Sequence, residues 1–364
     1  MPIRWVSIIL SFALFADYSS AQDYSVLVAK EVAAERVDAV NGGGHFPVMV
    51  RLDSGDLVAA VRAGGAHVGI KGRLDWIRSK DNGKTWTRTT LVDGPQDDRN
   101  PAVGQLRDGT LVVTYHSAGG YGPNGEAPAR GAALIRDGLY VVRSFDRGTT
   151  WETPVKSEVP LEFAASGYGK IVQLQALMAV YYLKGTPYRH ISYLYRSTNG
   201  GRTWGDQSKI ADDFDETALV VLPEDRLMAV LRSKNGAFLS TSFSEDKGRT
   251  WSRPRQITAK QEHPADVILL NDGRLLLTYG ERNRPYGVRA KISKDLGLSW
   301  EPETIVLVAD AENTDCGYPS SAEISPGKVV TLYYGVNGIY DPYGKDPESL
   351  SRVFTRAVLW SVPR

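Results

Sequence analysis

The sequence predicts an all-β fold, a six-bladed β-propeller of four-stranded antiparallel blades. Three observations indicate it: an eight-residue motif that occurs five times, a hairpin pattern that recurs between its copies, and a composition rich in turn-forming and aromatic residues. The 364 residues include 36 glycines, 18 tyrosines and 8 tryptophans but a single cysteine. A chain of this length and apolar content buries a large core without disulfides, and its many glycines favour tight turns between strands.

The eight-residue motif has the pattern S-x-D-x-G-x-[TS]-W, and we call its copies the turn repeats. They occupy residues 79–86, 144–151, 197–204, 244–251 and 293–300, with Asn199 replacing Asp in one copy. Asp or Asn bonds to nearby backbone, glycine takes a positive φ, and the tryptophan packs on the following strand. Each copy therefore predicts a structural hairpin turn.

A second pattern precedes most turn repeats: an apolar strand, a turn with acidic residues or glycine, and another apolar strand. It covers residues 48–61, 103–115, 219–231, 268–279 and 321–333, with a degenerate copy at 170–183. Two successive hairpins make a four-stranded unit of propeller-blade length. We expect the last blade to combine residues 353–360 with residues 24–32. The whole forms a single domain over residues 22–364.

Residues 1–21 have the pattern of a secretion signal. Arg4 supplies the positive charge, residues 5–16 are largely apolar, and Ser19-Ser20-Ala21 forms a small-residue cleavage site. The apolar run is shorter than the roughly 20 residues that a membrane-spanning helix requires. We therefore expect a secreted or periplasmic protein that does not insert into a membrane after the signal is removed.

Charge and cysteine usage exclude several partners and cofactors. With 43 Lys and Arg against 42 Asp and Glu, the net charge of +1 provides no field that would attract nucleic acid. Cys316 has no partner for an internal disulfide, and no Cys/His cluster has zinc spacing. The sequence thus predicts no metal and no cofactor, and a monomer is the expected state.

Strand direction predicts which end of the propeller carries function. Both kinds of turn lie at one end, so the first strands begin, and the second strands finish, at the opposite end, where loops carry chemistry. Polar and aromatic residues at these positions include His45, Arg99, Asn100, Tyr168, Asp215, Glu216, His263, Asp315 and Tyr318 at strand starts, and Arg62, His116, Arg232, Arg282 and Tyr334 at strand ends. Arginine forks suit carboxylates and aromatic faces suit sugars, which predicts an acidic glycan as the ligand.

With these motifs the chain resembles the sialidase (neuraminidase) superfamily, in which the turn repeats are called Asp boxes. The stretch from Glu216 to Arg232 resembles the family segment that carries the catalytic Glu and one Arg of a carboxylate-binding triad. Residues 318–333 resemble a later family segment, which places Tyr318 on the nucleophile. The third triad arginine precedes the last Asp box in the family, and the candidates here are Arg282, Arg284 and Arg289.

Two positions depart from the family pattern. His45-Phe46-Pro47 stands where the family has Arg-Ile-Pro, so the first triad arginine is missing. The family's acid/base Asp belongs in the loop within residues 62–75, where His67 and Asp75 are the candidates.

The resemblance implies an exo-glycoside hydrolase that removes a terminal sialic acid or a related acidic sugar. Tyr318 would attack with Glu216 as its base, while His67 or Asp75 would protonate the leaving oxygen. The predicted substrate-binding residues are Arg232, Arg282, Arg289, His45, Arg62 and Arg99.

Two other classes remain open. One is a propeller polysaccharide lyase acting on uronate-containing glycans, which His45 opposite Tyr318 favours. The other is a propeller that binds glycans without catalysis. The sugar, its linkage and the outcome at the anomeric centre are not determined by the sequence.

Overall fold

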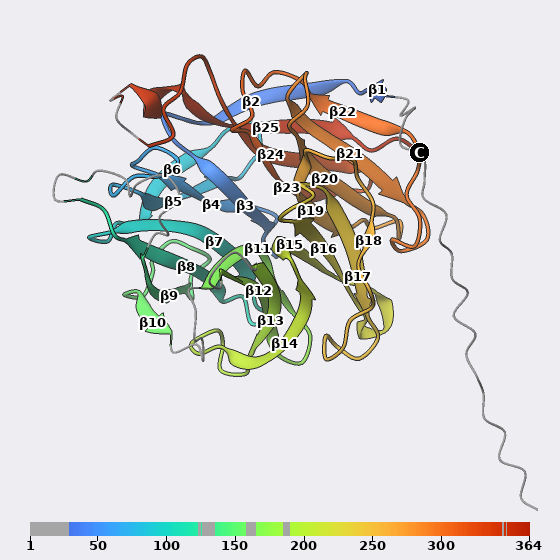
Figure 1. Cartoon of the computed structure of the whole chain (residues 1–364), viewed down its shortest axis with the longest axis horizontal. Helices are drawn as coiled ribbons and strands as arrows, with labels where there is room; N and C mark the ends of the chain where they lie inside the picture. The colour runs from blue at the N-terminus through green and yellow to red at the C-terminus, as the bar shows by residue number, and fades with distance from the viewer. Residues whose placement is uncertain are drawn as a thin grey trace, which may run out of the picture.

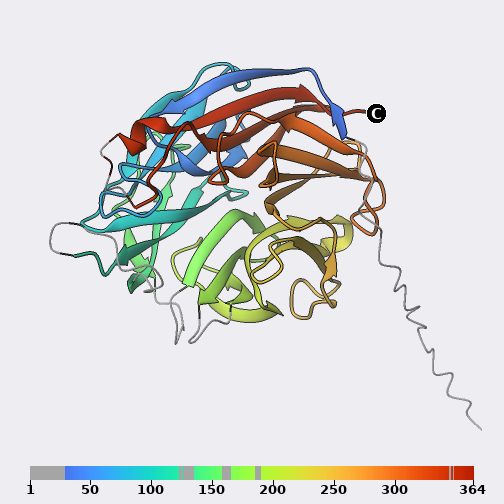
Figure 2. The same cartoon turned by 45° about the horizontal axis from the view of Figure 1, so that its top comes forward.

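The computed structural model describes residues 29–122, 125, 135–157, 165–184, 190–343, 346 and 348–364. The predicted signal at residues 1–21 lies outside the described residues. Within them the chain is almost entirely β, as predicted, with two short 3-10 helices, η1 (Pro223–Asp225) and η2 (Ser349–Arg352). Small sheets are arranged around a centre in a propeller-like ring, which the two views of Figure 1 and Figure 2 show.

Three of the sheets have four strands each. In order along each sheet, the strands are β3 (His45–Arg51), β4 (Leu57–Ala63), β5 (Arg73–Ser79) and β6 (Thr87–Val92); β15 (Phe214–Val221), β16 (Leu227–Ser233), β17 (Leu239–Ser244) and β18 (Arg255–Gln256); and β23 (Gly317–Ser325), β24 (Lys328–Val336), β25 (Val353–Ser361) and β2 (Ala34–Asn41).

A fourth sheet has five strands, and a fifth has eight. The five-stranded sheet contains β19 (Glu262–Leu269), β20 (Leu275–Glu281), β21 (Gly287–Ser293), β22 (Thr304–Val308) and β1 (Ala29–Glu31). The eight-stranded sheet joins two four-stranded halves: β7 (Asp97–Gln105), β8 (Leu111–Gly119), β9 (Ile135–Ser144) and β10 (Val155–Ser157) with β11 (Ala165–Gln173), β12 (Leu177–Lys184), β13 (His190–Ser197) and β14 (Gly205–Asp212). Their junction is a short parallel pairing between β7 and β11, in which Ala102 faces Gly169 and Val103 faces Lys170.

The innermost strands close the ring. Among the described residues, β3, β7, β11, β15, β19 and β23 contact one another in chain order, and β23 contacts β3. Apolar side chains fill the space between neighbouring sheets; Met49 and Val61 of one sheet, for example, pack with Val330 and Leu332 of the next. In the interior, the Lys170 ammonium contacts Asp266 at 2.6 Å and the Ser321 carbonyl at 2.8 Å, which ties three inner strands together.

The closing strand differs from the prediction. Residues 34–41 form β2, which pairs antiparallel with β25. Of the predicted closing segment, residues 24–28 lie outside the described residues, and residues 29–31 form β1, which runs parallel to β22 of the neighbouring sheet. Val37 and Val40 of β2 pack into the cluster that holds Val330 and Ala357. The segment that closes the last sheet is therefore the one whose apolar residues reach that core.

The turn repeats have the local structure that the sequence predicts. In all five, the serine hydroxyl donates to the Asp or Asn carboxyl or amide oxygen at 2.7–3.0 Å and accepts from the glycine N–H at 2.7–2.9 Å. The glycines have φ between 80° and 91°.

Each turn repeat also contacts the preceding sheet of the ring or, for the repeat at residues 197–204, the preceding half of the eight-stranded sheet. A Cβ on its glycine would approach a side chain of that sheet to within 3.0 Å: Val330, Trp76, Val112, Leu194 and Met228 face Gly83, Gly148, Gly201, Gly248 and Gly297. Glycine is required there for close approach as well as for its positive φ. The turn repeats thus fasten neighbouring sheets together.

Candidate functional site

A β-bulge interrupts the start of every inner strand. The pairing register shifts after His45, Arg99, Tyr168, Phe214, Glu262 and Gly317. Bulges bend a strand and re-aim its side chains. Several residues inside these bulges have a positive φ, which is uncommon for side chains other than glycine: Phe46 at 54°, Asn100 at 52° and Tyr318 at 49°. The bulges therefore determine which side chains face the end of the ring.

Bulge residues line a cavity of about 380 Å³ at this end of the ring. Its described lining includes four cationic side chains, Arg99, Arg232, Lys234 and Arg282, against two carboxylates, Asp215 and Glu216. Phe46, His67, Val68, Asn100, His116, His190 and Tyr318 complete the lining. A cavity with an excess of positive charge favours an anionic ligand.

Tyr318 and Glu216 are in direct contact in this cavity. The Tyr318 hydroxyl donates to Glu216 Oε1 at 2.6 Å, and the Arg232 guanidinium donates to Glu216 Oε2. Arg232 Nη1 also lies 3.5 Å from the Tyr318 oxygen. Burial and the negative charge of Glu216 raise the pKa of Tyr318 well above its usual value. The phenol is therefore neutral at rest, and its contact carboxylate is the group placed to take its proton.

Asp215 supports Arg232 from the other side. Its carboxylate lies 3.7 Å from Arg232 Nε and 3.0 Å from His190 Nδ1. Burial alone would raise the pKa of Asp215, but the charges of Arg232 and His190 hold that pKa at about 2. Burial also disfavours the charged form of Arg232, which lowers its pKa. Glu216 and Asp215 outweigh this effect and together raise the pKa of Arg232 well above its usual value. Arg232 is thus a permanent cation at the cavity wall.

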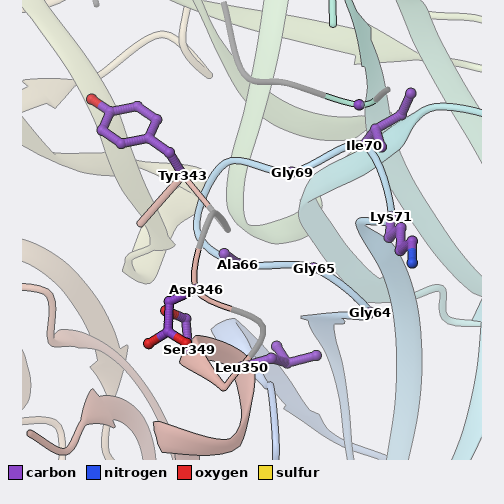
Figure 3. Close-up of a pocket in the computed structure, with 11 residues that line it drawn as sticks. Gly64, Gly65, Ala66, Gly69, Ile70, Lys71, Tyr343, Asp346, Ser349 and Leu350 are labelled. Atoms are coloured by element: carbon purple, nitrogen blue, oxygen red, sulfur yellow. The ribbon is translucent and has the colours of Figure 1, made fainter. Parts of the chain in front are cut away.

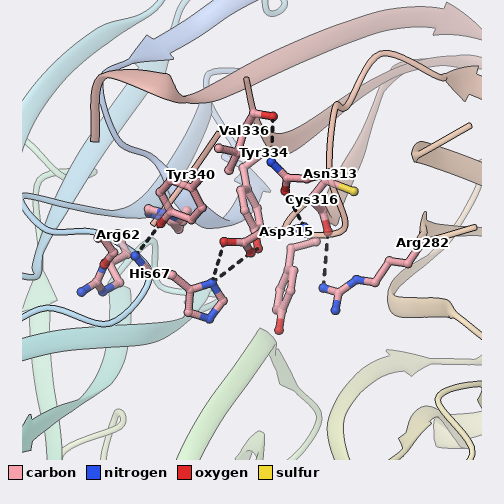
Figure 4. Close-up of polar contacts among 12 residues, drawn as sticks. Arg62, His67, Arg282, Asn313, Asp315, Cys316, Tyr334, Val336 and Tyr340 are labelled. Atoms are coloured by element: carbon pink, nitrogen blue, oxygen red, sulfur yellow. Dashed lines mark hydrogen bonds and ion pairs between the residues drawn. The ribbon is translucent and has the colours of Figure 1, made fainter. Parts of the chain in front are cut away.

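His67 reaches the cavity from the loop between β4 and β5 and is paired with an acid. Its Nδ1 lies 2.9 Å from Asp315 Oδ1, which also accepts the Tyr334 hydroxyl at 2.6 Å. Figure 4 shows His67 beside Asp315, with Tyr334 and Tyr340 close by. Burial would raise the pKa of Asp315, but His67 and its other partners hold that pKa well below the usual range. A carboxylate on Nδ1 orients the imidazole and leaves Nε2 for proton exchange.

The structure brings six of the predicted site residues to one cavity: Tyr318, Glu216, His67, Arg232, Arg282 and Arg99. Among the candidates for a third triad arginine, Arg282 lies over the Tyr318 ring, 5.7 Å from its centroid. Arg284 instead covers Tyr286. Arg289 donates to the backbone carbonyls of Val308 and Pro285, at 2.6 and 2.9 Å.

Four predicted residues do not line this cavity. Asp75 is buried within its own sheet and accepts from Arg73 at 2.8 Å and from Arg88 at 2.5 Å. Arg289 is held by backbone, as described above. His45 is fully buried behind Phe46, and its Nε2 lies 3.0 Å from the Tyr340 hydroxyl. Burial and nearby Arg62 lower the pKa of His45 well below its usual value.

Arg62, the fourth of these residues, anchors the loop that carries His67. It is fully buried and donates to Asp97 Oδ1 from Nε at 3.0 Å and from Nη2 at 2.6 Å. It also donates to the carbonyls of Gly65, Ala66 and Gly69 in the loop. Figure 3 shows this glycine-rich loop passing from Gly64 to Lys71 near Ser349 and Leu350 of η2, where a separate cavity of about 400 Å³ lies.

Sequence reasoning missed His190 and Lys234 as cavity residues. His190 opens β13, and Lys234 follows the end of β16 by one residue. Third strands begin at the same end as first strands, so a search extended to their starts would have found His190. The pairing of His67 with Asp315 had no signal, because the two lie 248 positions apart.

Cys316 is buried, and burial raises the pKa of its thiol to about 11.

Across the described residues, no cluster of three or more His, Cys, Asp or Glu side chains has an arrangement that would hold a metal ion. In the same part of the chain, none of the helices has the length and apolar character needed to cross a membrane.

The small sheets form a propeller-like ring with a polar cavity at one end. The chain belongs to the BNR repeat-like domain family, whose model matches residues 93–330, and with it to the sialidase/BNR-repeat superfamily.

Two curated relatives, both named sialidase, match part of the chain. One from Bacteroides fragilis (strain YCH46) is 23% identical over 214 residues, which cover 54% of this chain and 39% of the relative. One from Paraclostridium sordellii is 25% identical over 268 residues, or 71% of this chain and 57% of the relative. The chain thus spans less than two thirds of either protein.

Solved structures share the fold. A protein of unknown function from Dyadobacter fermentans DSM 18053 superimposes with a TM-score of 0.76 at 24% identity, covering 90% of this chain and 98% of that one. The Hadza microbial sialidase Hz136 gives 0.66 at 20% identity, covering 86% and 65%. The intramolecular trans-sialidase from Ruminococcus gnavus gives 0.63 at 14% identity, covering 90% and 97%. At these identities the likeness concerns the fold alone.

Proposed function

We propose that the protein is a sialidase-like exo-glycoside hydrolase that removes a terminal sialic acid or a related acidic sugar from a glycan. The observation that carries this proposal is the 2.6 Å hydrogen bond from Tyr318 to Glu216, made at the wall of a cationic cavity. The Glu216 carboxylate is placed to take the proton of the Tyr318 phenol as it reacts, and Arg232 lies beside the phenol oxygen. The relatives' names support the same class of reaction.

In the proposed first step, the Tyr318 oxygen attacks the anomeric carbon and its proton passes to Glu216. The bond from that carbon to the leaving oxygen breaks, and the imidazolium of His67 gives the leaving oxygen a proton. A covalent glycosyl–tyrosine results. In the second step, His67 accepts a proton from water, the water oxygen attacks the anomeric carbon, and Tyr318 leaves and regains its proton from Glu216. The anomeric configuration is retained over the two displacements.

His67 serves this scheme better than Asp75. His67 lines the cavity and Asp75 does not. Asp315 on Nδ1 stabilises the imidazolium and turns Nε2 to the proton-transfer side.

A neutral nucleophile and fixed cations suit an anionic substrate. An ionised carboxylate nucleophile would repel the substrate's carboxylate, whereas the phenol does not. Arg232 and Arg282 flank Tyr318 and are the proposed carboxylate-binding pair. With His45 buried in place of a third arginine, Arg99 across the cavity is the remaining arginine of its described lining.

The second candidate is a polysaccharide lyase. His67 and Tyr318 share a cavity with arginines that would neutralise a uronate carboxylate, and this pair would abstract and return a proton. His45, on which this alternative first depended, is buried behind the cavity wall. The hydrolase is favoured because Tyr318 contacts its own carboxylate base.

We further propose six blades, counting each half of the eight-stranded sheet as one, since six inner strands follow one another around the described ring. Residues 22–364 would form this one domain. Residues 1–21 would direct export to the periplasm or the medium, and the mature protein would act as a monomer on a glycan.

The deciding experiment is hydrolysis of a fluorogenic α-linked sialic acid glycoside by the purified mature protein. Wild type should release the fluorophore, and Tyr318→Phe should not, while both bind the free sugar. Tyr115→Phe, which alters a buried tyrosine away from the described cavity lining, is the matched control. Absence of turnover on all acidic glycosides, combined with an unsaturated product absorbing in the near ultraviolet from uronate polymers, would establish the lyase instead.

A further inference from the structure

A cavity of about 380 Å³ lies apart from the candidate active site, where the connection from β6 to β7 meets strands β7, β8 and β9 (Figure 1). We call it the β6–β9 pocket. Arg99 of β7 and His116 of β8 line the cavity that contains Tyr318. Their neighbours in the chain, Asp98 and Ser117, lie on the other face of the same strands and line the β6–β9 pocket. The two cavities therefore share no residue of their described linings.

The β6–β9 pocket has the opposite charge to the candidate active site. Its described lining contains two carboxylates, Asp93 and Asp98, and no Lys, Arg or His side chain. Asp98 is 2% exposed, and its described hydrogen bonds come from neutral donors, the Gly94 N–H at 2.7 Å and the Ser117 hydroxyl. Burial raises the pKa of the Asp98 carboxyl above its usual value. A buried carboxylate is most stable beside a cation, and the described lining supplies none.

The other groups of the pocket suit an organic cation. Tyr140 lines the pocket and stacks on the buried Tyr115, with ring centroids 5.5 Å apart and planes at 20°. The face of a tyrosine ring attracts a cation through its quadrupole. Gln96 Oε1 is buried, and no described group donates a hydrogen bond to it. A ligand with N–H donors would satisfy this acceptor, which is otherwise removed from water without compensation.

We propose that the β6–β9 pocket binds a small organic ammonium ion, a function beyond the proposed hydrolysis. The ammonium group would donate hydrogen bonds to Asp98 and to Gln96 Oε1, and its hydrocarbon part would pack on the Tyr140 ring. Asp93 and Pro95 are exposed at this pocket, so the ligand enters from solvent. A quaternary ammonium has no N–H donor and therefore binds more weakly than a primary one.

Isothermal titration calorimetry with n-pentylammonium tests the proposal. Wild type should bind it at one site with a Kd of about 1 mM or lower, and should bind 1-pentanol and tetramethylammonium at least about tenfold more weakly. Asp98→Asn keeps the side-chain shape but removes the charge, so it should weaken n-pentylammonium binding at least about tenfold. Asp108→Asn neutralises an exposed carboxylate in the turn at the far end of the same hairpin. It is the matched control and should leave the affinity unchanged.

A second variant keeps the test decisive if Asp98→Asn lowers the thermal midpoint. Gln96→Met removes the buried acceptor, so it should weaken n-pentylammonium binding about fivefold and leave tetramethylammonium binding unchanged. Nα-acetyl-lysine methylamide distinguishes two sources of the ammonium group: affinity equal to that of n-pentylammonium indicates a lysine side chain, and weaker binding indicates a free amine. Absence of saturable binding to wild type, equal affinity for 1-pentanol, or an affinity unchanged in both variants would overturn the proposal.

Discussion

The Tyr318 hydroxyl and the Glu216 carboxylate meet at 2.6 Å although they lie 102 positions apart in the chain. Each belongs to a bulge at the start of an inner strand, Glu216 in β15 and Tyr318 in β23. Arg232, at the end of the strand paired with β15, contacts both. The contact therefore depends on the ring bringing the open ends of separate sheets to one place.

Glu216→Gln should lower kcat/KM on the fluorogenic sialoside by about 10²–10⁴-fold, because an amide cannot accept the Tyr318 proton. The side-chain shape is preserved, so the thermal midpoint should change little. Glu224→Gln, in the exposed turn η1 at the far end of the same hairpin, should leave the rate unchanged. A Glu216→Gln protein with more than about a tenth of wild-type activity would exclude Glu216 as the base.

His67→Ala should affect substrates according to their leaving group. An alkyl glycoside needs a proton on the leaving oxygen, so its rate should fall about 10²–10³-fold, whereas the glycosyl fluoride of the same sugar should lose much less. Asp315→Asn removes the carboxylate that contacts His67 Nδ1. Its rates should lie between those of wild type and His67→Ala, with the alkyl glycoside again affected more than the fluoride. If the rates on both substrates fall by the same factor, His67 acts in substrate binding and not in protonation of the leaving oxygen.

Arg62→Met should cost about 3 kcal/mol of unfolding free energy, measured by urea denaturation, because it removes the buried guanidinium that donates twice to Asp97 Oδ1. Asp97 keeps its contacts with Arg99 and Tyr121 through Oδ2. The substitution also frees three loop carbonyls, so activity should fall with stability.

Arg147→Met breaks an ion pair with Asp53 whose side chains are 56% and 53% exposed, and should leave the unfolding free energy close to that of wild type because solvent screens such a pair. Similar costs for the two variants would contradict the anchoring role of Arg62.

The turn repeats should matter for stability and not for catalysis. Asp146 accepts from the Thr150 backbone and hydroxyl, and Asp146→Ala should cost about 1 kcal/mol with kcat/KM unchanged. Asp146→Asn should be close to wild type, because Asn199 makes equivalent bonds at the matching position, with its amide donating to the Thr203 hydroxyl. Thermal unfolding and the fluorogenic assay check both effects, and an activity loss in Asp146→Ala without unfolding would point to a different role.

Asp215 should stabilise the fold in a pH-dependent manner. Its folded pKa, about 2, is below the ordinary value, so its contribution is complete above about pH 4 and is lost as the pH falls through the folded pKa. The difference in unfolding free energy between wild type and Asp215→Asn should therefore shrink by about 1 kcal/mol between pH 6 and pH 3. Urea titrations at both pH values measure it. A difference that stays constant would show that the Asp215 pKa is not depressed.

The turn repeats were predictable because each is made by bonds within eight residues. The serine, the Asp or Asn and the glycine of a repeat satisfy one another locally, so the pattern S-x-D-x-G is sufficient to recognise the turn. The all-β fold followed from their recurrence. The gathering of Arg99, Glu216, Arg232 and Tyr318 also followed, since hairpins determine the direction of each strand and hence the end at which it opens.

The bulges explain where that reasoning failed. In a regular strand, successive side chains point to opposite faces of the sheet. The extra residue of a bulge changes which of two neighbouring side chains faces the cavity. Phe46 lines the cavity and His45 lies behind it, because the register shifts after His45. Asp75 and Arg289 lie inside strands β5 and β21 and find partners within their own sheets.

The sequence by itself determined the strands, their turns and the end of the ring where polar residues collect, because these depend on hydrogen bonds and side-chain periodicity over a few residues. Only the tertiary structure decided which of those polar residues meet. Closure by residues 34–41, the burial of Arg62 and His45, and the pairing of His67 with Asp315 depend on packing between sheets far apart in the chain. Such contacts leave no local pattern, since their partners are chosen by the geometry of the closed ring.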